Sequence, residues 1–417
     1  MSGPRHVAVI GAGIVGVATA LFLQRDAHRV TLIDRAGPAA GASYGNAGGV
    51  VLSACMPIGM PGIVCRVPAM LLDRDGPLRV RWRYLPRIAP WLLAFVRASH
   101  PARVEEISCT LAAILRAAEA PWHDLVRGRA VAALLRPVGW LRVYDTDAGF
   151  AAVRPVLDLM TRRGFTFEVL SQAALRELEP ALAPIFRRGV WHPESYSVAD
   201  PGRMVRDLAA AFVADGGTLM RAEVRDIETA NGASRVMTDG GPIAADAVVV
   251  AAGAWSRALA RRLGVRVPLD TERGYHLMLA PAEPGLRRPT VWGERGFVLA
   301  PHAEGIRLTS GVEFAGLDAP PDFRPIRRLV PLARRMLPSL RAEERSAWLG
   351  FRPSLPDSLP VIGPVPGRRD IFFAFGHGHL GLTLGPATGR AVADVIAGRR
   401  PAFDLEPFAV ARWSCRR

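Results

Sequence analysis

The sequence predicts a two-domain α/β protein, in which a parallel sheet is assembled from separate stretches of the chain and an antiparallel sheet is inserted between them. Three observations support this prediction. The 417 residues are too many for one ordinary core. Apolar, strand-like runs alternate with helical patterns near both ends of the chain. Short alternating strands separated by turn residues fill 267–314.

The first 34 residues predict a dinucleotide site of the Rossmann type. An apolar strand at 7–10 runs into three glycines, a helix follows to about residue 24, and a second apolar strand ends on an acid. The glycines allow a tight turn, close approach of a pyrophosphate and close helix–strand packing, and the acid accepts a ribose hydroxyl. These elements alone allow either NAD or FAD. The residues assigned to this site are Gly11, Gly13, Ile14, Val15, Gly16, Asp34 and Arg35.

The same stretch has a second interpretation as a targeting segment. Residues 7–24 carry no charge over eighteen positions, which is long enough to resemble a membrane span. Three glycines at dinucleotide spacing make a poor apolar helix, however, and no small-residue cleavage site follows. The pattern favours a buried strand followed by a buried helix.

The charge of +15 points to nucleic acid or anionic lipid at first sight. All 53 basic residues are arginine and they are spread along the chain, which indicates a compositional bias, and we expect no nucleic-acid partner. The absence of lysine excludes Schiff-base chemistry. Because Cys55, Cys65, Cys109 and Cys415 form no CxxC pair, the cysteines predict a reducing compartment and no metal site.

Two segments before residue 100 have unusual composition. Residues 36–65 carry no charge, and GASYGNAGGVV at 41–51 contains four glycines, which suits a backbone folded against something flat and buried, or an apolar loop under the core. In 71–97, arginines from Arg74 to Arg87 alternate with Trp82, Tyr84 and Trp91. Such a segment either lies on a membrane surface or surrounds an ordinary core helix with extended arginine side chains.

Further elements follow from periodicity and turn residues. We expect Asp200 to cap a helix that begins with proline at its first position. We expect the apolar strand at 246–251 to join the first sheet. Helices are predicted at 101–127, 148–163, 201–215, 323–336 and 384–398, and strands at 140–144, 218–220, 224–227, 236–238, 246–251, 275–279, 296–299 and 306–309.

Six motifs together resemble the D-amino-acid oxidase superfamily of flavoproteins, and most of all its bacterial D-amino-acid and D-hydroxyproline dehydrogenases. The resemblance spans nearly the whole chain, and the motifs occur in the family's order. They are GAGIVG (11–16), GASYGNAGG (41–49), VVVAAGAWS (248–256), ERGYH (272–276), GFRPSLPDSLPVIG (350–363) and GHGHLGLTLGP (376–386).

The resemblance implies a non-covalent FAD, whose ADP half lies on the N-terminal glycine turn. It also implies a discontinuous FAD-binding domain (1–70, 200–266 and 345–417) and a substrate domain (71–199 and 267–344). A helix after the last glycine turn would direct its N-terminus at the flavin, where reduced flavin carries negative charge. The further FAD-binding residues implied are Ser43, Asn46, Ala47, Gly48, Val224, Ala251, Gly253, Trp255, Gly378, Gly381, Leu382 and Thr383.

The resemblance also implies four residues for the chemistry. Arg352 would hold the substrate carboxylate with its planar guanidinium. Tyr275 would hydrogen-bond the same carboxylate and His276 would line the pocket, although both residues also suit the core of a strand. The backbone carbonyl of His379 would face the substrate amine.

The implied reaction is oxidative deamination of a D-amino acid or cyclic imino acid, with hydride passing from Cα to flavin N5. Because sarcosine-oxidase-like relatives use a lysine above the flavin to activate oxygen, its absence favours a dehydrogenase that reduces a quinone or another acceptor, although other oxidases of the superfamily also lack this lysine. A cytoplasmic enzyme is expected, with possible peripheral contact of 71–97 at the inner face of the membrane. The alternatives are an oxygen-using glycine or sarcosine-type oxidase, a nicotinamide-dependent dehydrogenase, and a flavin domain serving RNA modification.

Overall fold

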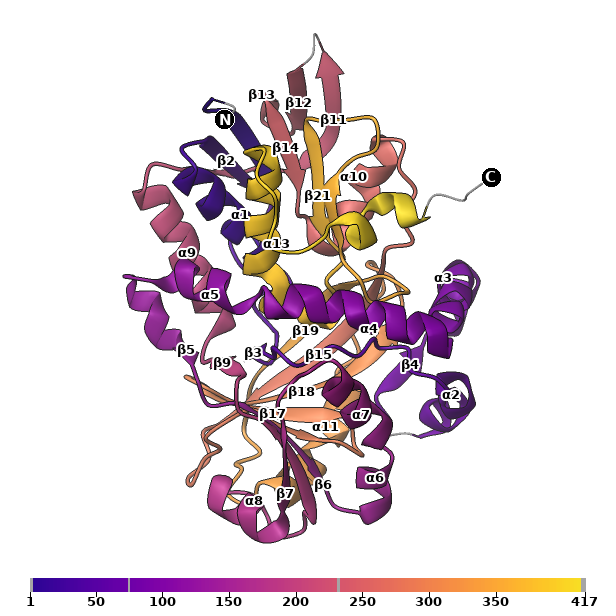
Figure 1. Cartoon of the computed structure of the whole chain (residues 1–417). Helices are drawn as coiled ribbons and strands as arrows, with labels where there is room; N and C mark the ends of the chain where they lie inside the picture. The colour runs from indigo at the N-terminus through magenta and orange to yellow at the C-terminus, as the bar shows by residue number, and fades with distance from the viewer. Residues whose placement is uncertain (1–2, 74–75, 231–232, 414–417) are drawn as a thin grey trace.

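Figure 1 shows the fold of the chain as a computed structural model, which describes residues 3–73, 76–230 and 233–413. Arg74 and Cys415 lie outside these residues. A parallel sheet with its helices forms one part and a larger sheet forms the other, with α4 (Pro101–Arg116) running across between them. This arrangement confirms the predicted two-domain α/β class.

The first sheet has six strands and is parallel except at one edge. Its central strand β1 (His6–Ile10) is almost entirely buried and pairs with β2 (Arg29–Asp34) and with β14 (Ala247–Val250). The prediction that the apolar strand near residue 250 joins this sheet is therefore confirmed. The order continues outward through β10 (Thr218–Arg221) on one side, and through β21 (Ile371–Phe375) and the antiparallel edge strand β20 (Val361–Pro364) on the other.

Two helices from opposite ends of the chain cross on one face of this sheet. They are α1 (Ile14–Arg25) and α13 (Gly381–Ile396), and α13 begins three residues before the predicted start. A Cβ at Gly389 would lie 2.7 Å from the backbone nitrogen of Thr19, so the crossing requires glycine. The neighbouring helix α9 (Pro201–Ala214) has the predicted cap, because the Asp200 side chain accepts a hydrogen bond from the Arg203 N–H.

Three helices predicted as continuous are each broken into two. The predicted helix at 101–127 is α4 followed by α5 (Glu119–Val126), and the one at 148–163 is α6 (Asp147–Ala151) followed by α7 (Arg154–Arg162). The predicted helix at 323–336 is α11 (Arg324–Arg328) followed by α12 (Val330–Met336). Each second helix has a proline in its first turn, namely Pro121, Pro155 and Pro331. Proline lacks the N–H that would bond to the carbonyl four residues earlier, so the first helix of each pair ends there.

The second sheet has nine strands and is mixed, whereas an antiparallel sheet was predicted. The pairs β16–β6 and β18–β4 are parallel and the other pairs are antiparallel. One edge strand, β19, was not predicted as a strand. The order is β19 (Glu344–Ser354), β15 (Asp270–Leu279), β18 (Gly305–Phe314), β17 (Phe297–His302), β16 (Thr290–Trp292), β6 (Trp140–Tyr144), β8 (Arg188–His192) and β7 (Glu168–Ser171), with β4 (Leu78–Val80) beside β18.

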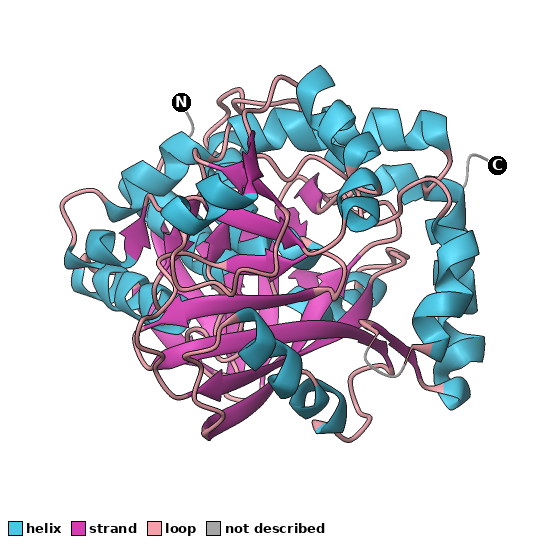
Figure 2. Cartoon of the chain, turned by 90° about the horizontal axis from the view of Figure 1, so that it is seen from below, coloured by secondary structure: helices cyan, strands magenta, loops and turns pink. Residues whose placement is uncertain are grey.

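The two faces of this sheet differ in what covers them. Leu277, Leu308 and other apolar side chains of one face pack against α11, α12 and α8 (Gln172–Leu178). The opposite face is directed at the first sheet. Seen from below, helices lie around the outside of the strands (Figure 2). The face without helices is therefore the one available to a ligand held by the first sheet.

Three further α-helices and two three-stranded sheets belong to the described chain. They are α2 (Ile63–Leu72), α3 (Leu85–Ala98), α10 (Ser256–Arg262), the sheet β11 (Val224–Ala230), β12 (Ala233–Thr238) and β13 (Gly241–Ala245), and the sheet β3 (Gly49–Val50), β9 (Tyr196–Val198) and β5 (Leu135–Arg136). Residues of α4 and α5 share the apolar core of α1 and α13, although the predicted boundaries assign them to the substrate domain. Those boundaries stay a prediction.

Candidate functional site

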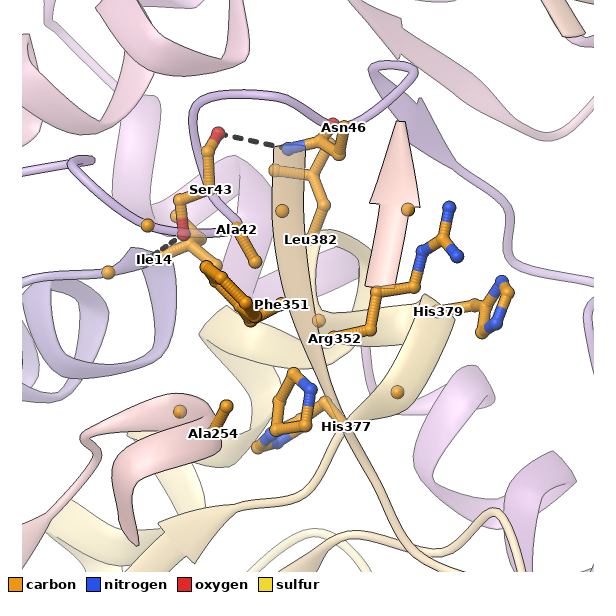
Figure 3. A pocket seen from close by; sticks show the side chains of 18 of the residues that line it. Ile14, Ala42, Ser43, Asn46, Ala254, Phe351, Arg352, His377, His379 and Leu382 are labelled. Carbon is orange, nitrogen blue, oxygen red and sulfur yellow. Dashed lines mark hydrogen bonds between the residues drawn. The ribbon is translucent and has the colours of Figure 1, made fainter. Parts of the chain in front are cut away.

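A large cavity of about 1070 Å³ is lined by residues of both sheets. Typical small-molecule sites occupy about 300–1,000 Å³, so this cavity has room for a cofactor and a substrate together. It extends from Asp34 and Glu223 at one end to Arg142 and His192 at the other. Figure 3 shows part of its lining.

The turn between β1 and α1 can be made only by glycine. Gly11 has a φ of +106°, and a Cβ there would lie 2.4 Å from the carbonyl oxygen of Ala251. A Cβ at Gly16 would lie 1.8 Å from the Gly11 oxygen. Gly13 lines the cavity at the start of α1. The backbone is therefore open at the N-terminus of α1, where unpaired N–H groups and the helix dipole favour an anionic group.

Asp34 holds this turn in place. Its carboxylate accepts hydrogen bonds from the N–H groups of Ala12 at 2.8 Å, of Ala36 at 2.8 Å and of Gly37 at 2.9 Å. Asp34 also lines the cavity, and its Oδ2, which accepts only the Ala12 bond, has capacity for a further donor such as a ribose hydroxyl. At the same end, the Arg35 guanidinium lies 4.2 Å from the centre of the Trp255 ring.

The glycine-rich loop at 41–49 is fastened to both sheets. The Ser43 hydroxyl accepts from the Ile14 N–H at 2.9 Å, and the Asn46 side chain bonds to the Ser43 carbonyl at 3.0 Å (Figure 3). From the second sheet, Arg307 donates to the Asn46 carbonyl at 2.7 Å. Ser43 thus acts as a side-chain acceptor for the first turn of α1. Nothing in the sequence motifs identified Arg307.

The C-terminal glycine turn forms the first turn of α13. Gly381, Leu382 and Thr383 line the cavity, and the first N–H groups of a helix have no partner within it. The predicted alignment of a helix N-terminus with the cavity therefore has a structural basis. His377 lies beneath the turn, where it hydrogen-bonds Thr388 at 2.9 Å and burial lowers its pKa to about 3.

Arg352 extends from β19 across the neighbouring strand. A Cβ at Gly274 would lie 2.3 Å from its Nη2, so the guanidinium lies flat over that glycine. Its Nη1 donates to the Gly311 carbonyl of β18 at 2.8 Å. Burial lowers the pKa of Arg352 and the charge of Glu272 opposes that shift. The fixed guanidinium presents its remaining N–H groups to the cavity.

A partly exposed histidine is hydrogen-bonded to a buried carboxylate beside Arg352. His379 Nε2 is 2.6 Å from Glu272 Oε2, and Glu272 is only 1% exposed. Burial alone would raise the pKa of Glu272, but His379 and Arg352 outweigh burial and hold that pKa below its usual value. In Figure 3 the His379 ring and the Arg352 guanidinium lie side by side. Glu272 was missed by the sequence, although it shares a strand with the predicted Tyr275 and His276.

Tyr275 and His276 have other positions than those expected. The Tyr275 hydroxyl donates to Glu313 at 2.5 Å, and its ring packs on Phe323 beside α11. Its hydroxyl therefore points to the helix-covered face, although Tyr275 also lines the cavity, and its hydrogen bond to the substrate carboxylate stays a prediction. His276 is on the cavity side, but it is buried, stacks on Trp348 and bonds through Nδ1 to the Gly45 carbonyl. It supports the loop at 41–49 and does not line the pocket.

The cavity brings together nearly all of the predicted residues. Gly16, Gly48 and His276 do not line it. Gly48 has a φ of +78° and packs against the Val198 backbone. Within the described ranges, no group of three or more His, Cys, Asp or Glu side chains is placed to hold a metal ion.

The residues present fit FAD. Three features support this. The turn at Gly11 and Gly16 has no room for a side chain, the Asp34 carboxylate lies beside it, and the N-termini of α1 and α13 both line the cavity. Because the cavity continues from this nucleotide end to Arg352, a dinucleotide and a carboxylate ligand can occupy it together.

Comparisons with known proteins agree with this interpretation. The sequence matches the family described as FAD dependent oxidoreductase (DAO) over residues 6–395. It is 38% identical to a D-amino-acid oxidase of Bradyrhizobium diazoefficiens, covering 98% of this chain and 99% of that protein. It is 31% identical to a D-amino acid dehydrogenase of Rhizorhabdus wittichii, covering 98% and 100%. The solved structure of glycine oxidase from Geobacillus kaustophilus superposes with a TM-score of 0.74 at 25% identity, covering 99% of both chains.

Proposed function

This chain belongs to the DAO family of FAD-dependent oxidoreductases, and on that premise we propose that it oxidatively deaminates a D-amino acid or a cyclic imino acid. The observation that carries the proposal is Arg352, a fixed guanidinium in the cavity that also contains the dinucleotide turn. When bound, FAD supplies the acceptor for the hydride that leaves Cα. The relatives named D-amino-acid oxidase and D-amino acid dehydrogenase support the D configuration.

In this proposal FAD is held without a covalent bond. Its ADP half would lie on the turn from Gly11 to Gly13, with Asp34 at the ribose. The loop at 43–48 and the first turn of α13 would hold the ring system. Cys55 does not line the cavity, and burial raises the pKa of its thiol, so it is a poor nucleophile for a covalent link.

The protein would contribute orientation and charge placement. Arg352 would bind the substrate carboxylate, because a guanidinium fixed by the Gly311 carbonyl still offers donors in a planar fork. The backbone carbonyl of His379 would accept a hydrogen bond from the substrate amine. These two contacts orient Cα–H, and the neutral amine supplies the lone pair that expels hydride. The imine product then hydrolyses to a 2-oxo acid and ammonia, or remains a pyrroline when the substrate is a proline.

Replacement of Arg352 by methionine tests the assignment. We expect a yellow protein that retains FAD but has a kcat/KM about 10²- to 10³-fold lower, because a charge-assisted bidentate contact is lost. Anaerobic bleaching of the flavin by D-amino acids, L-amino acids and cyclic imino acids measures this. The control is Arg345→Met on the same strand, whose side chain donates to the Glu304 carbonyl at the surface. Unchanged turnover in Arg352→Met contradicts the assignment.

The proposed electron acceptor is a membrane quinone, reached through the segment 71–97. Among the described residues, six of the eleven exposed large hydrophobic side chains belong to this segment, and Ile58 and Val64 lie just before it. Leu72 is 83% exposed and Trp82 is 71% exposed. Figure 1 shows α2 and α3 beside each other at one edge of the molecule. An apolar surface flanked by arginines suits an anionic bilayer.

The structure bears on both interpretations of this segment. Ile88 and Trp91 of α3 are buried against Phe314, as in an ordinary core helix, while Leu85, Leu93 and Val96 remain exposed. No helix in the described part of the chain has the length and apolarity to span a bilayer. Contact with a membrane in this proposal is therefore limited to its surface.

Vesicle sedimentation tests the membrane contact. We expect the protein to sediment with vesicles containing phosphatidylglycerol, and the double variant Leu72→Ser, Trp82→Ser to stay in the supernatant, because it loses two exposed apolar anchors. The matched control is Val213→Ser, Leu219→Ser, which removes two exposed apolar side chains elsewhere. Equal sedimentation of both double variants contradicts a role for 71–97.

A second candidate is an oxygen-using oxidase, which the 38% identity to a D-amino-acid oxidase favours. Reoxidation of the substrate-reduced enzyme distinguishes the two. Fast reoxidation by a soluble quinone with slow reoxidation by air supports the dehydrogenase, and the reverse supports the oxidase.

A further inference from the structure

The cavity continues beyond Arg352 along the face of the second sheet that no helix covers. One row of mutually paired residues crosses six strands on this face, and every member except His276 lines the cavity. The row consists of Arg142, Val291, Val298, Thr309, His276 and Trp348. Because paired residues in adjacent strands point to the same side, Arg142, which is exposed, lines the same cavity as Arg352.

Beside this row, toward Arg352, lies a row of glycines that also line the cavity: Gly293, Gly296, Gly311, Gly274 and Gly350. Side chains of Tyr144, Pro77, Arg352 and Trp348 cover four of them, and only a Cβ at Gly311 would have no other atom within 4 Å. Arg352 crosses β15 over Gly274 and reaches the Gly311 carbonyl on β18. From β18 to the strand of Arg142 there are three strand spacings, or about 14 Å. The two arginines therefore line the same cavity, with Val291 and Val298 on the strands between them.

Arg142 is not neutralised by the protein. Among the described residues no carboxylate forms an ion pair with it, and the acidic side chains that line the cavity, Asp34 and Glu223, are at the nucleotide end. Its side chain hydrogen-bonds Tyr144, and its charge acts on His192. His192 is 5% exposed and bonds to the Ser53 hydroxyl at 3.0 Å. Burial, and then the charge of Arg142, lower the pKa of His192 to about 3, so the imidazole ring is neutral at pH 7. Arg142 therefore supplies the positive charge at this end of the cavity.

We propose that Arg142 binds a second anionic group of the substrate, so that the enzyme prefers amino acids whose side chain ends in a carboxylate. This inference rests on the proposed function, in which Arg352 binds the α-carboxylate. An exposed cation at the rim of a cavity, without a carboxylate partner among the described residues, can form a charge-assisted hydrogen bond to an anion in that cavity. Val291 and Val298 then contact the methylene groups between the two carboxylates.

Substrate pairs that differ only in this charge test the inference. We expect kcat/KM for D-glutamate to exceed that for D-glutamine by about ten- to hundredfold, and D-aspartate to exceed D-asparagine. In Arg142→Gln this ratio falls to about one. In Arg187→Gln, which removes the same charge from an exposed pair with Asp147 outside the cavity, the ratio stays as in the parent. Equal use of acid and amide by the parent enzyme, or an unchanged ratio in Arg142→Gln, overturns the inference.

Equilibrium binding separates this inference from the proposed function. Glutarate and its monoamide are titrated into the FAD-loaded protein by calorimetry, and glutarate binds about tenfold tighter only when Arg142 is present. If no amine bleaches the flavin but this preference holds, the proposed deamination is wrong and the anion site stands. If neutral D-amino acids are oxidised and glutarate has no advantage, the deamination stands and the anion site is wrong.

Discussion

Gly274 and Arg352 act together, because the guanidinium occupies the space where a side chain at 274 would be. The motif predicted Arg352, but the sequence did not predict a role for Gly274. That role depends on the pairing of β15 with β19, which places Gly274 under the guanidinium. The same pairing decides the face of Tyr275. The alternation of residues along a strand shows which side chains share a face, but it does not show which face the helices cover. The side of the sheet to which the Tyr275 hydroxyl points could therefore not be predicted from the sequence.

Gly274→Ala should displace the guanidinium of Arg352 without disturbing the FAD site. The added Cβ would lie within 2.3–2.7 Å of three guanidinium atoms. We expect the KM for amino acid to rise and kcat/KM to fall on the order of tenfold to hundredfold, with FAD content unchanged. Steady-state kinetics and the flavin spectrum measure this.

Gly240→Ala is the control for this substitution, because its added Cβ would meet only Thr238 Oγ1 at 3.7 Å. Equal kinetics for Gly274→Ala and Gly240→Ala would show that the glycine does not position Arg352. A loss of FAD in Gly274→Ala would show that the damage extends beyond the arginine.

At the scale of elements, the order and the type of most helices and strands could be predicted, and several boundaries could not. Apolar spacing continues through Pro121, Pro155 and Pro331, so periodicity alone joined helices that the missing N–H groups separate. Strand β19 was missed because its sequence, ERSAWLGFRPS, contains charged residues, glycine and proline in place of regular alternation. This segment forms a strand because it pairs with β15 along its whole length, although its own sequence has no strand pattern.

The α1–α13 crossing gives a prediction that compares two positions on one helix. A Cβ at Gly389 would press on the Thr19 and Ala18 backbone at 2.7–3.0 Å, whereas a Cβ at Gly385 would meet the Ile14 side chain at 3.1 Å. The backbone of α1 cannot move away from an added Cβ as easily as the Ile14 side chain can. Gly389→Ala should therefore lower the free energy of unfolding by about 1–3 kcal/mol and weaken FAD binding, and Gly385→Ala should do clearly less. Thermal denaturation and FAD titration measure both, and equal effects would contradict this account of the crossing.

At the scale of the whole molecule, buried neutral histidines connect stability to pH. Burial lowers the pKa of His192 to about 3, of His276 to about 4 and of His377 to about 3. In the unfolded chain these rings titrate near pH 6.5. Between pH 6.5 and about 4 the unfolded chain therefore binds protons that the folded chain does not. The stabilisation is complete above pH 6.5 and is lost as the pH falls through this window.

We expect the free energy of unfolding to fall by about 1.4 kcal/mol per pH unit for each of these histidines below pH 6.5. Urea unfolding at pH 7 and pH 5 measures the slope. His377→Gln should reduce the slope, because one of these groups is removed. The exposed His100, replaced by Asn, serves as the control and should leave the slope unchanged. A stability that does not change over this range would contradict the assignment of neutral rings.

The two-domain architecture could be predicted from the whole sequence because glycine motifs mark the first sheet at both ends of the chain. The mixed pairing of the second sheet could not, because the partners β6 and β16 are separated by almost 150 residues and nothing in either strand encodes direction. The same long separation hid Arg142, which is opposite Arg352 only through pairings across the full width of the sheet.

The crossing of α1 on α13 also has a consequence for biosynthesis. A ribosome makes β1 and α1 more than 350 residues before α13, so the wall of the cavity formed by Gly381, Leu382 and Thr383 does not exist until that helix has been translated. Until then the apolar surface of α1 lacks its partner helix. We therefore expect FAD to be retained only by chains in which α13 has been made.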